Sequence, residues 1–426
     1  MKIDSAFRQK YQLDEPVVRA IALIGIGKHG SKSLPDELIA ACKTELKNPD
    51  LNPIQKGAFW GALMIKKRSE EEDSIGLLLG KDAFQNPVFF LNRLCPDLPP
   101  HLFPIGLKLL QGNFLQSNEA TQLGDFLLDD ATSCEVFKGM SVTILRVRHE
   151  TNHEYAGLLD SIQKTYSPGF QRFVKTKLPI VQLAEPFDGV ENSYLITPLL
   201  AQFFQDRNYN AVTAIGRSSG PKYGLNAYDL YLYLGSWLLQ NNHELLEMNP
   251  LFGWVLDQKA LSPALDVWVE RRRFMLKRPF LATVEKILNP CGARILVTSV
   301  FHITYQMKMA ELALLAGFDG VLVLKRGLEG SLSAATSKSN GLLCAVRNSS
   351  NHLFFTQFDS DMLAFKSFQT TDDEVVEDLS VEQNATLIKT FLKSGKTENA
   401  DFDNRVNYAN ALFKKGLDWI ESQIGY

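Results

Sequence analysis

The residues best suited to chemistry follow an apolar run that begins near residue 178. The sequence LPIVQLAEPFDGVENSYLIT reads as a buried strand, then a loop, then a helix that starts at Thr197. This order is typical of phosphate sites, because loop N–H groups and a helix N-terminus both attract anions. The loop, however, contains the acidic Glu185 and Pro186, which has no N–H, and few of the glycines that let a backbone close around an anion. We therefore expect the scaffold of a phosphate site with eroded chemistry.

Two loops are expected to line this pocket, because loops that follow parallel strands meet at the carboxyl edge of the sheet, where such sheets bind ligands. The candidate anion-binding residues are Asp188, Gly189, Thr197, Gly216 and Arg217. A plainer interpretation stays open, in which Asp188 and Gly189 form only a turn and Thr197 only caps a helix.

The densest basic segment lies further along the chain, with aromatic residues between its charges. Its candidate ligand-binding residues are Arg271, Arg272, Arg273, Lys277 and Arg278. If the segment is one helix, Arg271, Lys277 and Arg278 lie broadly on one side. Such a cluster could bind a carboxylate or phosphate at Arg272, or contact nucleic-acid phosphates. The alternative is a solvated helical face balanced by the acidic residues just before it.

Three other signals carry less weight. A GxGxxG pattern at Gly25, Gly27 and Gly30 indicates a dinucleotide site only within a βαβ unit, and a helical pattern follows it instead. We expect turn and helix-cap glycines there. His302 follows an apolar strand and could face the pocket, although a hydrogen-bonded structural histidine is the favoured interpretation. Glu329 has no acidic neighbour, so we expect no metal site at this residue.

Length, composition and charge place the chain among ordinary globular proteins. It has 426 residues, 45% of them hydrophobic and 22% charged, and a formal net charge of −3. These values exclude bulk disorder and a globally basic nucleic-acid binder, but leave room for a local basic patch. Five scattered cysteines without a CxxC pair indicate a reducing compartment. No apolar run is long enough to span a membrane and the N-terminus lacks a secretion signal, so we expect a cytoplasmic protein.

The elements that must position these residues fall into two kinds. Residues 1–175 repeat apolar side chains every three or four positions, which predicts helices. From about residue 178, short β-branched runs alternate with helical segments, which predicts a largely parallel sheet covered on both faces. The predicted strands are LPIVQL, NAVTAIG, ARILVTSV, GVLVLK and GLLCAV. Residues 225–285 are predicted to be helical and to pack beside the N-terminal helices, and residues 359–385 to form an acidic connection before two closing helices.

The helical region also contains a faint internal repeat. IQKGAFWGALMIKKRSEEE (residues 54–72) and VFKGMSVTILRVRHETNHE (residues 136–154) share a Lys-Gly pair, an apolar helix, a basic step and an acidic continuation, 82 residues apart. Two copies of one helical hairpin would explain this repeat. The alternative is that amphipathic helices resemble each other in general.

Together, these segments resemble the anthranilate phosphoribosyltransferase family, which shares its fold with pyrimidine nucleoside phosphorylases. GNFLQSNEATQLGDFLLDD is similar to a helix of the family's bundle, and FDGVENSYLITPLL to its phosphoribosyl loop and following helix. The resemblance implies an α/β fold with a helical bundle, divided into an N-terminal extension (1–98), a bundle domain (99–176) and an α/β domain (177–426) with a helical insertion near 225–285. It also implies a homodimer formed through the helical domain.

The resemblance carries over little of the family's catalytic equipment. Of its Gly-Thr-Gly-Gly-Asp loop only Asp188 and the following glycine persist, and of the Asn-x-Ser-Thr that opens the next helix only Thr197. The Asp-Glu pair that holds magnesium in the family corresponds to Leu332 and Ser333, so no metal cofactor is expected. Arg272 falls where the family's arginine binds the aromatic acid.

Two functional hypotheses follow. The first is a divergent glycosyltransferase-family protein with a phosphate or phosphoribosyl pocket between its domains, in which any pentosyl transfer proceeds without magnesium. Each missing stabilising group of that kind typically costs ~10²–10³ in rate. The second is a non-catalytic protein that binds nucleic acid along a basic interdomain groove, because the likeness is greatest to a nonclassical branch of the family that is associated with nucleic-acid binding. Both hypotheses expect a phosphate-bearing partner, and neither expects a membrane.

Overall fold

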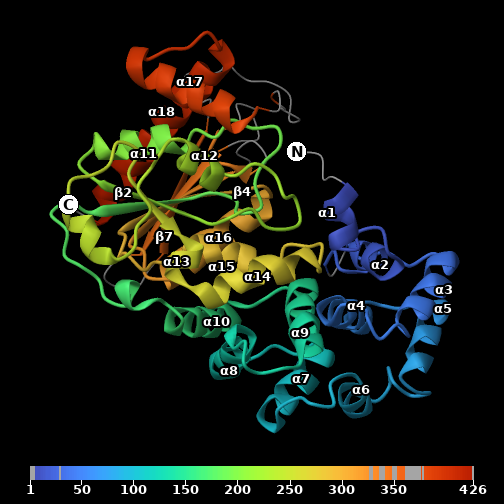
Figure 1. Cartoon of the computed structure of the whole chain (residues 1–426). Coiled ribbons are helices and arrows are strands. Elements are labelled where there is room, and N and C mark those ends of the chain that lie inside the picture. Colours follow the sequence, from blue (N-terminus) through green and yellow to red (C-terminus); the bar gives the residue numbers. More distant parts are fainter. Residues whose placement is uncertain are drawn as a thin grey trace.

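One sheet organises the second half of the molecule (Figure 1). The computed structural model describes residues 5–27, 30–325, 330–334, 341–347, 353–359, 376 and 379–424. Within these residues the strands are β1 (Ile180–Ala184), β2 (Asn210–Ile215), β3 (Trp254–Asp257), β4 (Ile295–Val300), β5 (Gly320–Lys325), β6 (Gly341–Arg347) and β7 (Leu353–Asp359). They form a single sheet in the order β3-β2-β1-β4-β5-β6-β7.

Helices make up the first half of the chain and cover the sheet in the second. The first set is α1 (Ser5–Lys10), α2 (Pro16–Ile24), α3 (Asp36–Glu45), α4 (Pro53–Ile65), α5 (Glu70–Asp73), α6 (Pro87–Leu94), α7 (Phe103–Leu110), α8 (Ser117–Leu128), α9 (Glu135–Arg148) and α10 (Asn152–Lys164). The second set is α11 (Thr197–Gln205), α12 (Ala227–Tyr233), α13 (Gln258–Leu261), α14 (Pro263–Arg273), α15 (Leu281–Ile287), α16 (Gln306–Leu315), α17 (Val381–Ser394) and α18 (Ala400–Ile424). Among the helices described, none is both long and apolar enough to cross a membrane.

The sheet is largely parallel, as the alternation of strands and helices predicts. β3, β2, β1, β4 and β5 run parallel, whereas β6 and β7 add an antiparallel edge. All five predicted strands are confirmed. The prediction of an all-helical stretch over residues 225–285 was wrong, because β3 lies within it and pairs with β2. β7 was also not predicted.

The two faces of the sheet bury different sets of side chains. Along β5, Val321 and Val323 join the core that contains α15 and α16, whereas Leu322 and Leu324 join the core that contains α11 and α18. This alternation is the two-residue period of a strand buried on both faces. Figure 1 shows α11, α17 and α18 on one side of the sheet and α13 to α16 on the other. The carboxyl ends of the parallel strands are thereby held in fixed positions.

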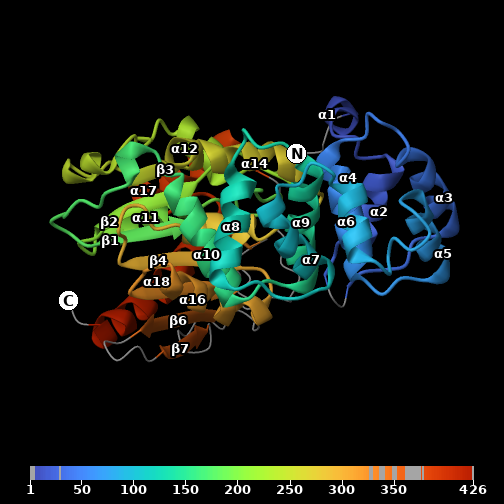
Figure 2. The ribbon, with the colours of Figure 1, turned by 90° about the horizontal axis from the view of Figure 1, so that it is seen from below.

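The N-terminal helices form a layer of their own beside this α/β part (Figure 2). α4 packs directly against α9, and glycines bring the two helix backbones together. A Cβ on Gly57 would lie 1.9 Å from the carbonyl oxygen of Val136, and one on Gly139 would lie 2.3 Å from that of Ile54. Since real side chains do not approach this closely, only glycine permits the contact at either position.

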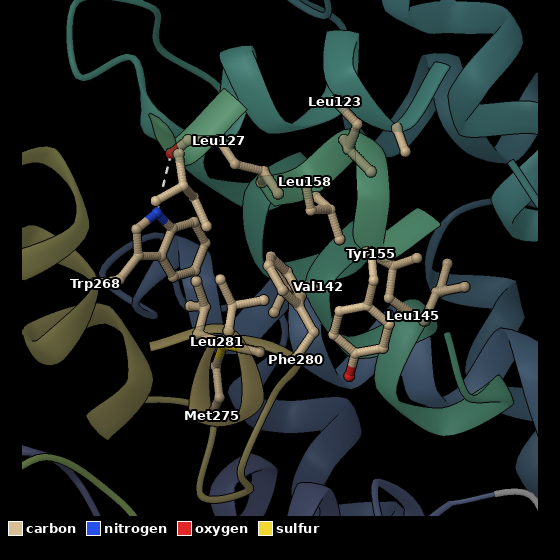
Figure 3. Close-up of a cluster of buried hydrophobic side chains, with 14 of the residues drawn as sticks. Leu123, Leu127, Val142, Leu145, Tyr155, Leu158, Trp268, Met275, Phe280 and Leu281 are labelled. Atoms are coloured by element: carbon tan, nitrogen blue, oxygen red, sulfur yellow. Dashed lines mark hydrogen bonds between the residues drawn. The ribbon is translucent and has the colours of Figure 1, made fainter. Parts of the chain in front are cut away.

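A single apolar cluster joins the bundle to the α/β part (Figure 3). Trp268 on α14 is 1% exposed, and its indole Nε1 donates to the carbonyl oxygen of Leu127 at 3.0 Å. Leu281 on α15 lies in the same core as Val142 and Leu158 of the bundle. Residues 225–285 therefore pack beside the N-terminal helices, as predicted, and hold the two parts of the molecule together.

Candidate functional site

Three loops meet at the carboxyl edge of the sheet, and we call their meeting point the interdomain site. They follow β1 (residues 185–196), follow β2 (residues 216–226) and join α14 to α15 (residues 274–280). The N–H of Gly224 donates to the carbonyl oxygen of Asp188 at 3.1 Å, and Arg278 Nε donates to the Asp188 carboxylate at 2.6 Å. The structure therefore brings the two predicted groups of site residues together.

Gly189 is needed where the first two loops touch. Its φ is +78°, and an added Cβ would lie 2.3 Å from the carbonyl oxygen of Gly224. The predicted turn at Asp188 and Gly189 is therefore present, and the Asp188 side chain is buried within it. Gly216 lies at the floor of the second loop, where its carbonyl oxygen accepts a hydrogen bond from Asn226 Nδ2 at 2.7 Å.

The largest difference from the expected phosphate-binding loop is the position of the Glu185 side chain. Its buried carboxylate accepts a hydrogen bond from the hydroxyl of Thr197, and the N–H of Leu332 lies 3.2 and 3.1 Å from its two oxygens. Thr197 thus begins α11 as predicted, but its hydroxyl bonds Glu185 and does not cap the helix. Burial raises the pKa of Glu185. A carboxylate of the protein itself occupies the end of the helix where an external anion was expected.

The residues at the position of the family's magnesium pair do not fit that ion. Leu332 and Ser333 carry no carboxylate, and the Leu332 N–H already serves Glu185. Across the described part of the chain, no three His, Cys, Asp or Glu side chains are grouped so that they could hold a metal. Mg²⁺ requires carboxylate and other oxygen ligands in octahedral geometry. The carboxylate that lies at Leu332, that of Glu185, is buried and already accepts hydrogen bonds from Thr197 and Leu332.

Arg272 is buried in an ion pair and does not face an open site. Its side chain and that of Glu285 are each 2% exposed, and Arg272 Nη1 lies 2.6 Å from the Glu285 carboxylate. A second nitrogen, Nη2, donates to the carbonyl oxygen of Gly220 at 3.3 Å. Burial raises the pKa of Glu285 to about 7 in spite of the guanidinium beside it. The arginine aligned with the aromatic-acid ligand of the family is therefore paired inside the protein, and its buried Nε has no hydrogen-bond partner among the described residues.

Two further arginines of the predicted site are also paired with acids. Arg217 bonds Asp266 at 3.0 Å and Glu270 at 2.6 Å, both on α14. Arg271 bonds Glu135 at the start of α9 and Asp130 just before it, at 2.8 and 2.9 Å. Arg271 therefore links the α/β part to the bundle. The solvated, acid-balanced helical face that the sequence left open is not formed, because the side chains of Arg271, Arg272 and Arg273 are only 13%, 2% and 15% exposed.

Lys277 and Arg278 lie on the loop and not on a helix. α14 ends at Arg273, and Leu276 adopts φ +54°, so the interpretation of the basic segment as one helix was wrong. The side chain of Arg278 is 36% exposed, and its Nη2 atom has no hydrogen-bond partner among the described residues. Burial lowers the pKa of Lys277, and no described carboxylate pairs with it. Arg278 is thus paired with Asp188 through Nε, whereas Lys277 has no carboxylate partner among the described residues.

The sequence did not indicate the buried charges on α15. Lys286 is 8% exposed, its Nζ donates to the carbonyl oxygen of Ser299 at 3.2 Å, and burial lowers its pKa to about 8. It follows Glu285 within the apolar segment ATVEKIL. These two adjacent charges within an otherwise apolar helix were the signal that could have indicated a buried charged site. Charged side chains are rarely fully buried unless they are paired.

The cavity at the interdomain site is small. It measures about 10 Å³ and is bounded by Phe187, Gln258 and Glu285 among other residues. A larger hollow of about 410 Å³ lies between α11, α17 and α18, far from the loops of the site. Its lining includes Phe203, Arg207 and Phe391. A ligand at the interdomain site therefore binds on its exposed rim unless the loops move apart.

Comparison with known proteins identifies the architecture. No family model matches the chain. An uncharacterized protein of Aquifex aeolicus (strain VF5) is 28% identical over 191 residues, which is 45% of this chain and 56% of that protein. The anthranilate phosphoribosyltransferase of Thermus thermophilus superimposes with a TM-score of 0.55 at 17% identity, covering 74% of this chain and 93% of that enzyme. The chain has the anthranilate phosphoribosyltransferase fold.

A second solved structure supports the same assignment of the fold. The anthranilate phosphoribosyltransferase of Saccharomyces cerevisiae, in complex with PRPP and Mg, superimposes with a TM-score of 0.54 at 16% identity and covers 74% of this chain and 91% of that enzyme. The resemblance that the sequence motifs indicated is thus confirmed for the fold. The matched part of the Aquifex relative is little more than half of its length, so that likeness adds no activity.

A second cluster of this anthranilate phosphoribosyltransferase fold lies between α9, α10 and α16. Tyr155 Oη donates to the Glu150 carboxylate at 3.4 Å and lies 3.0 Å from Tyr305 Oη, which lies 3.1 Å from the hydroxyl of Thr283. Arg146 contributes nearby, with its nitrogens bonded to backbone carbonyl oxygens. Desolvation raises the pKa of Glu150 to about 7 from its ordinary 4.5.

The variant Glu150→Gln is expected to be more stable than the parent above pH 7. A carboxyl group with a raised pKa costs stability once it ionises, so the parent loses stability as the pH rises from about 4.5 to 7. Glutamine cannot ionise, so the advantage of the variant should grow across this window to about 1–3 kcal/mol. Urea unfolding at pH 5 and pH 8 measures this difference, with Glu37→Gln on the exposed face of α3 as control. Equal values at both pH values would contradict the argument.

The weaker signals of the sequence do not join the interdomain site. Gly25 is the residue after α2, and its N–H caps the carbonyl oxygen of Ile21, so helix-cap glycine is confirmed there. His302 is exposed two residues after β4, and no hydrogen bond joins its side chain to another described residue, so the hydrogen-bonded structural histidine that was favoured is not found. Glu329 lies outside the described residues, as does most of the acidic segment 359–385.

Proposed function

We propose that this chain binds a small phosphate-bearing molecule on the rim of the interdomain site and does not transfer a phosphoribosyl group from a diphosphate donor. The observation that carries the proposal is the position of Arg278. Its Nε holds the buried Asp188 carboxylate, the side chain is 36% exposed, and its buried Nη2 atom has no hydrogen-bond partner among the described residues. Arginine N–H groups match the oxygens of a phosphate, and Lys277, the preceding residue of the same loop, carries a second positive charge.

The position of Glu185 supports the second half of this proposal. A diphosphate leaving group carries several negative charges, which must be stabilised as the glycosidic bond breaks. In this chain the helix end at Thr197 already faces a buried carboxylate, and Leu332 and Ser333 provide no ligand for a divalent ion. With several stabilising groups missing at ~10²–10³ each, phosphoribosyl transfer to anthranilate is expected to be undetectable.

The pairing of the arginines favours a small ligand over nucleic acid. Binding to nucleic acid depends on cations that displace counterions from several phosphates in a row. Here Arg217, Arg271 and Arg272 are each committed to carboxylates of the chain. Two cations on one loop suit a single phosphate group.

Isothermal titration tests the proposal. Inorganic phosphate, ribose 5-phosphate and PRPP, each with and without Mg²⁺, are titrated into the parent and into Lys277→Met. We expect binding of at least one phosphate compound without any need for Mg²⁺, and about tenfold weaker binding by the variant. Lys259→Met, on the exposed part of α13, is the matched control and should bind as the parent does.

Two results would overturn the proposal. Fluorescence-detected consumption of anthranilate with PRPP and Mg²⁺ would show that transfer survives. Failure of every phosphate compound to bind, together with a gel shift of nucleic acid that weakens steeply with salt, would favour the nucleic-acid hypothesis instead.

A further inference from the structure

We propose that α2 to α5 (residues 16–73) are a second copy of the helical unit α7 to α10 (residues 103–164), and that α4 occupies the surface of α9 at which a second copy of this chain would dock. The inference rests on local contacts that recur at an offset of 82 residues, or 81 for one leucine, and on a reciprocal contact between the copies. α2 and α7 precede the matched helices in each unit but do not start at this offset. It is independent of the ligand proposed above.

The two units begin their last helix in the same way. Ser69 caps α5 and forms a capping box with Glu72, and Thr151 caps α10 and forms a capping box with Glu154. Each capping residue and each glutamate is 82 residues from its counterpart. The same local structure, a capping box at the start of the last helix, therefore occurs in both units.

The buried glutamate also has the same partners in both units. Glu72 pairs with Lys66 and accepts a hydrogen bond from the N–H of Leu34 at 2.9 Å. Glu154 pairs with Arg148, 82 residues after Lys66, and accepts from the N–H of Leu115, also at 2.9 Å. Leu34 and Leu115 each lie just before the second helix of their unit, α3 and α8. In each unit a buried carboxylate thus ties three segments together.

The copies contact one another reciprocally. Gly57 of α4 lies against the backbone of Val136, and Gly139 of α9 lies against the backbone of Ile54. Positions 57 and 139 correspond at the offset of 82 residues, as do positions 54 and 136. The contact between positions 57 and 136 is thus repeated, with the copies exchanged, between positions 139 and 54. Such a reciprocal pair of contacts is the signature of a two-fold interface between identical subunits. Here both halves of such an interface lie on one chain.

General likeness between amphipathic helices does not account for these matches. It predicts shared apolar spacing, but not a common capping box, a common buried ion pair and paired glycines at a single offset. The faint repeat between residues 54–72 and 136–154 is therefore a structural duplication.

The duplication changes the expected assembly. α4 covers the face of α9, so a second chain cannot reach it, and the full chain is monomeric. The first copy also contributes to the interdomain site, because Arg146 donates to the carbonyl oxygens of Gly25 and Ile26 as well as to that of Arg278. The loop at Gly25 and Ile26, which follows the first helix of the first copy, thus lies beside the loop that carries Arg278.

The mass of the full chain in solution tests this inference. Gel filtration with light scattering is expected to give 47.8 kDa, and the same value when the protein is concentrated to roughly 100 µM. A particle of twice that mass would overturn the inference.

Reciprocal glycine variants give a second test on the full chain. Gly57→Ala and Gly139→Ala each force a methyl group against the opposite backbone, so both should lower the urea midpoint markedly. Gly112→Ala is the control, because its methyl group would meet no atom within 4 Å and the variant bears only the strain of φ +74°. In the double variant the loss should be smaller than the two single losses together, since one contact is disrupted twice. Fully additive losses would mean that the glycines do not share a contact, and would overturn the inference. If a variant fails to fold, the mass of the parent still decides.

Discussion

Arg272→Met is expected to lower the free energy of unfolding by about 3–5 kcal/mol at pH 8, because it leaves the buried carboxylate of Glu285 without its counter-ion. The pair is 2% exposed on both sides, so water cannot replace the guanidinium. Burial already raises the pKa of Glu285 to about 7, and loss of Arg272 raises it further. Protonation of Glu285 in the variant removes the unpaired buried charge, so the loss of unfolding free energy should be smaller at pH 5 than at pH 8. Urea unfolding at the two pH values measures both quantities.

The double variant Arg272→Met with Glu285→Leu is the matched control for this prediction. Replacing both members of a buried ion pair with apolar side chains is often close to neutral, whereas removing one member is not. We expect the double variant to recover most of the lost stability. A double variant as unstable as the single one would show that Arg272 acts through its hydrogen bond to Gly220 rather than through Glu285.

Trp268→Ala is expected to lower the free energy of unfolding by about 3–5 kcal/mol, as large-to-small substitutions in a core do. The indole is 1% exposed and fills the cluster between α14 and the bundle (Figure 3). Its removal leaves a cavity at the joint of the two parts and leaves the carbonyl oxygen of Leu127 without its donor. Thermal or urea unfolding followed by circular dichroism measures the loss.

Two variants separate the contributions of this tryptophan. Trp268→Phe keeps most of the apolar contact and loses the hydrogen bond, so it should cost only about 1–2 kcal/mol. Trp237→Ala changes an indole that is 53% exposed and should cost about 1 kcal/mol or less. Comparable losses for Trp268→Ala and Trp237→Ala would contradict the assignment of the joint to Trp268.

The sequence predicted the parallel core of the sheet because its strands are buried on both faces. Such strands are continuous β-branched and apolar runs, as in ILVTSV of β4 and GVLVLK of β5, and these stand out from amphipathic helices. β3 is only four residues long and lies among helical segments, so its pattern is too short to identify. β7 is an edge strand with Phe354 and Phe355 exposed, so it lacks the alternation of a half-buried strand.

The candidate site was predicted in position but not in chemistry. Loops after parallel strands meet at a known edge, so the convergence of Asp188 and Gly216 could be expected, whereas Arg278 lies on the loop between α14 and α15 and could not be placed in this way. The partners of the arginines could not be predicted, because Glu285 lies on α15 and Glu135 on α9, whereas Arg272 and Arg271 lie on α14. Pairing between distant segments depends on packing that local periodicity does not encode.

The contact between α4 and α9 has one more consequence. Two subunits that associate through identical surfaces separate on dilution, and any substitution in one appears at the same time in the other. When both surfaces are carried by one polypeptide, they stay at a fixed high effective concentration and do not separate on dilution. Each copy is also free to change alone, as the difference between Lys66 and its arginine counterpart at position 148 already illustrates.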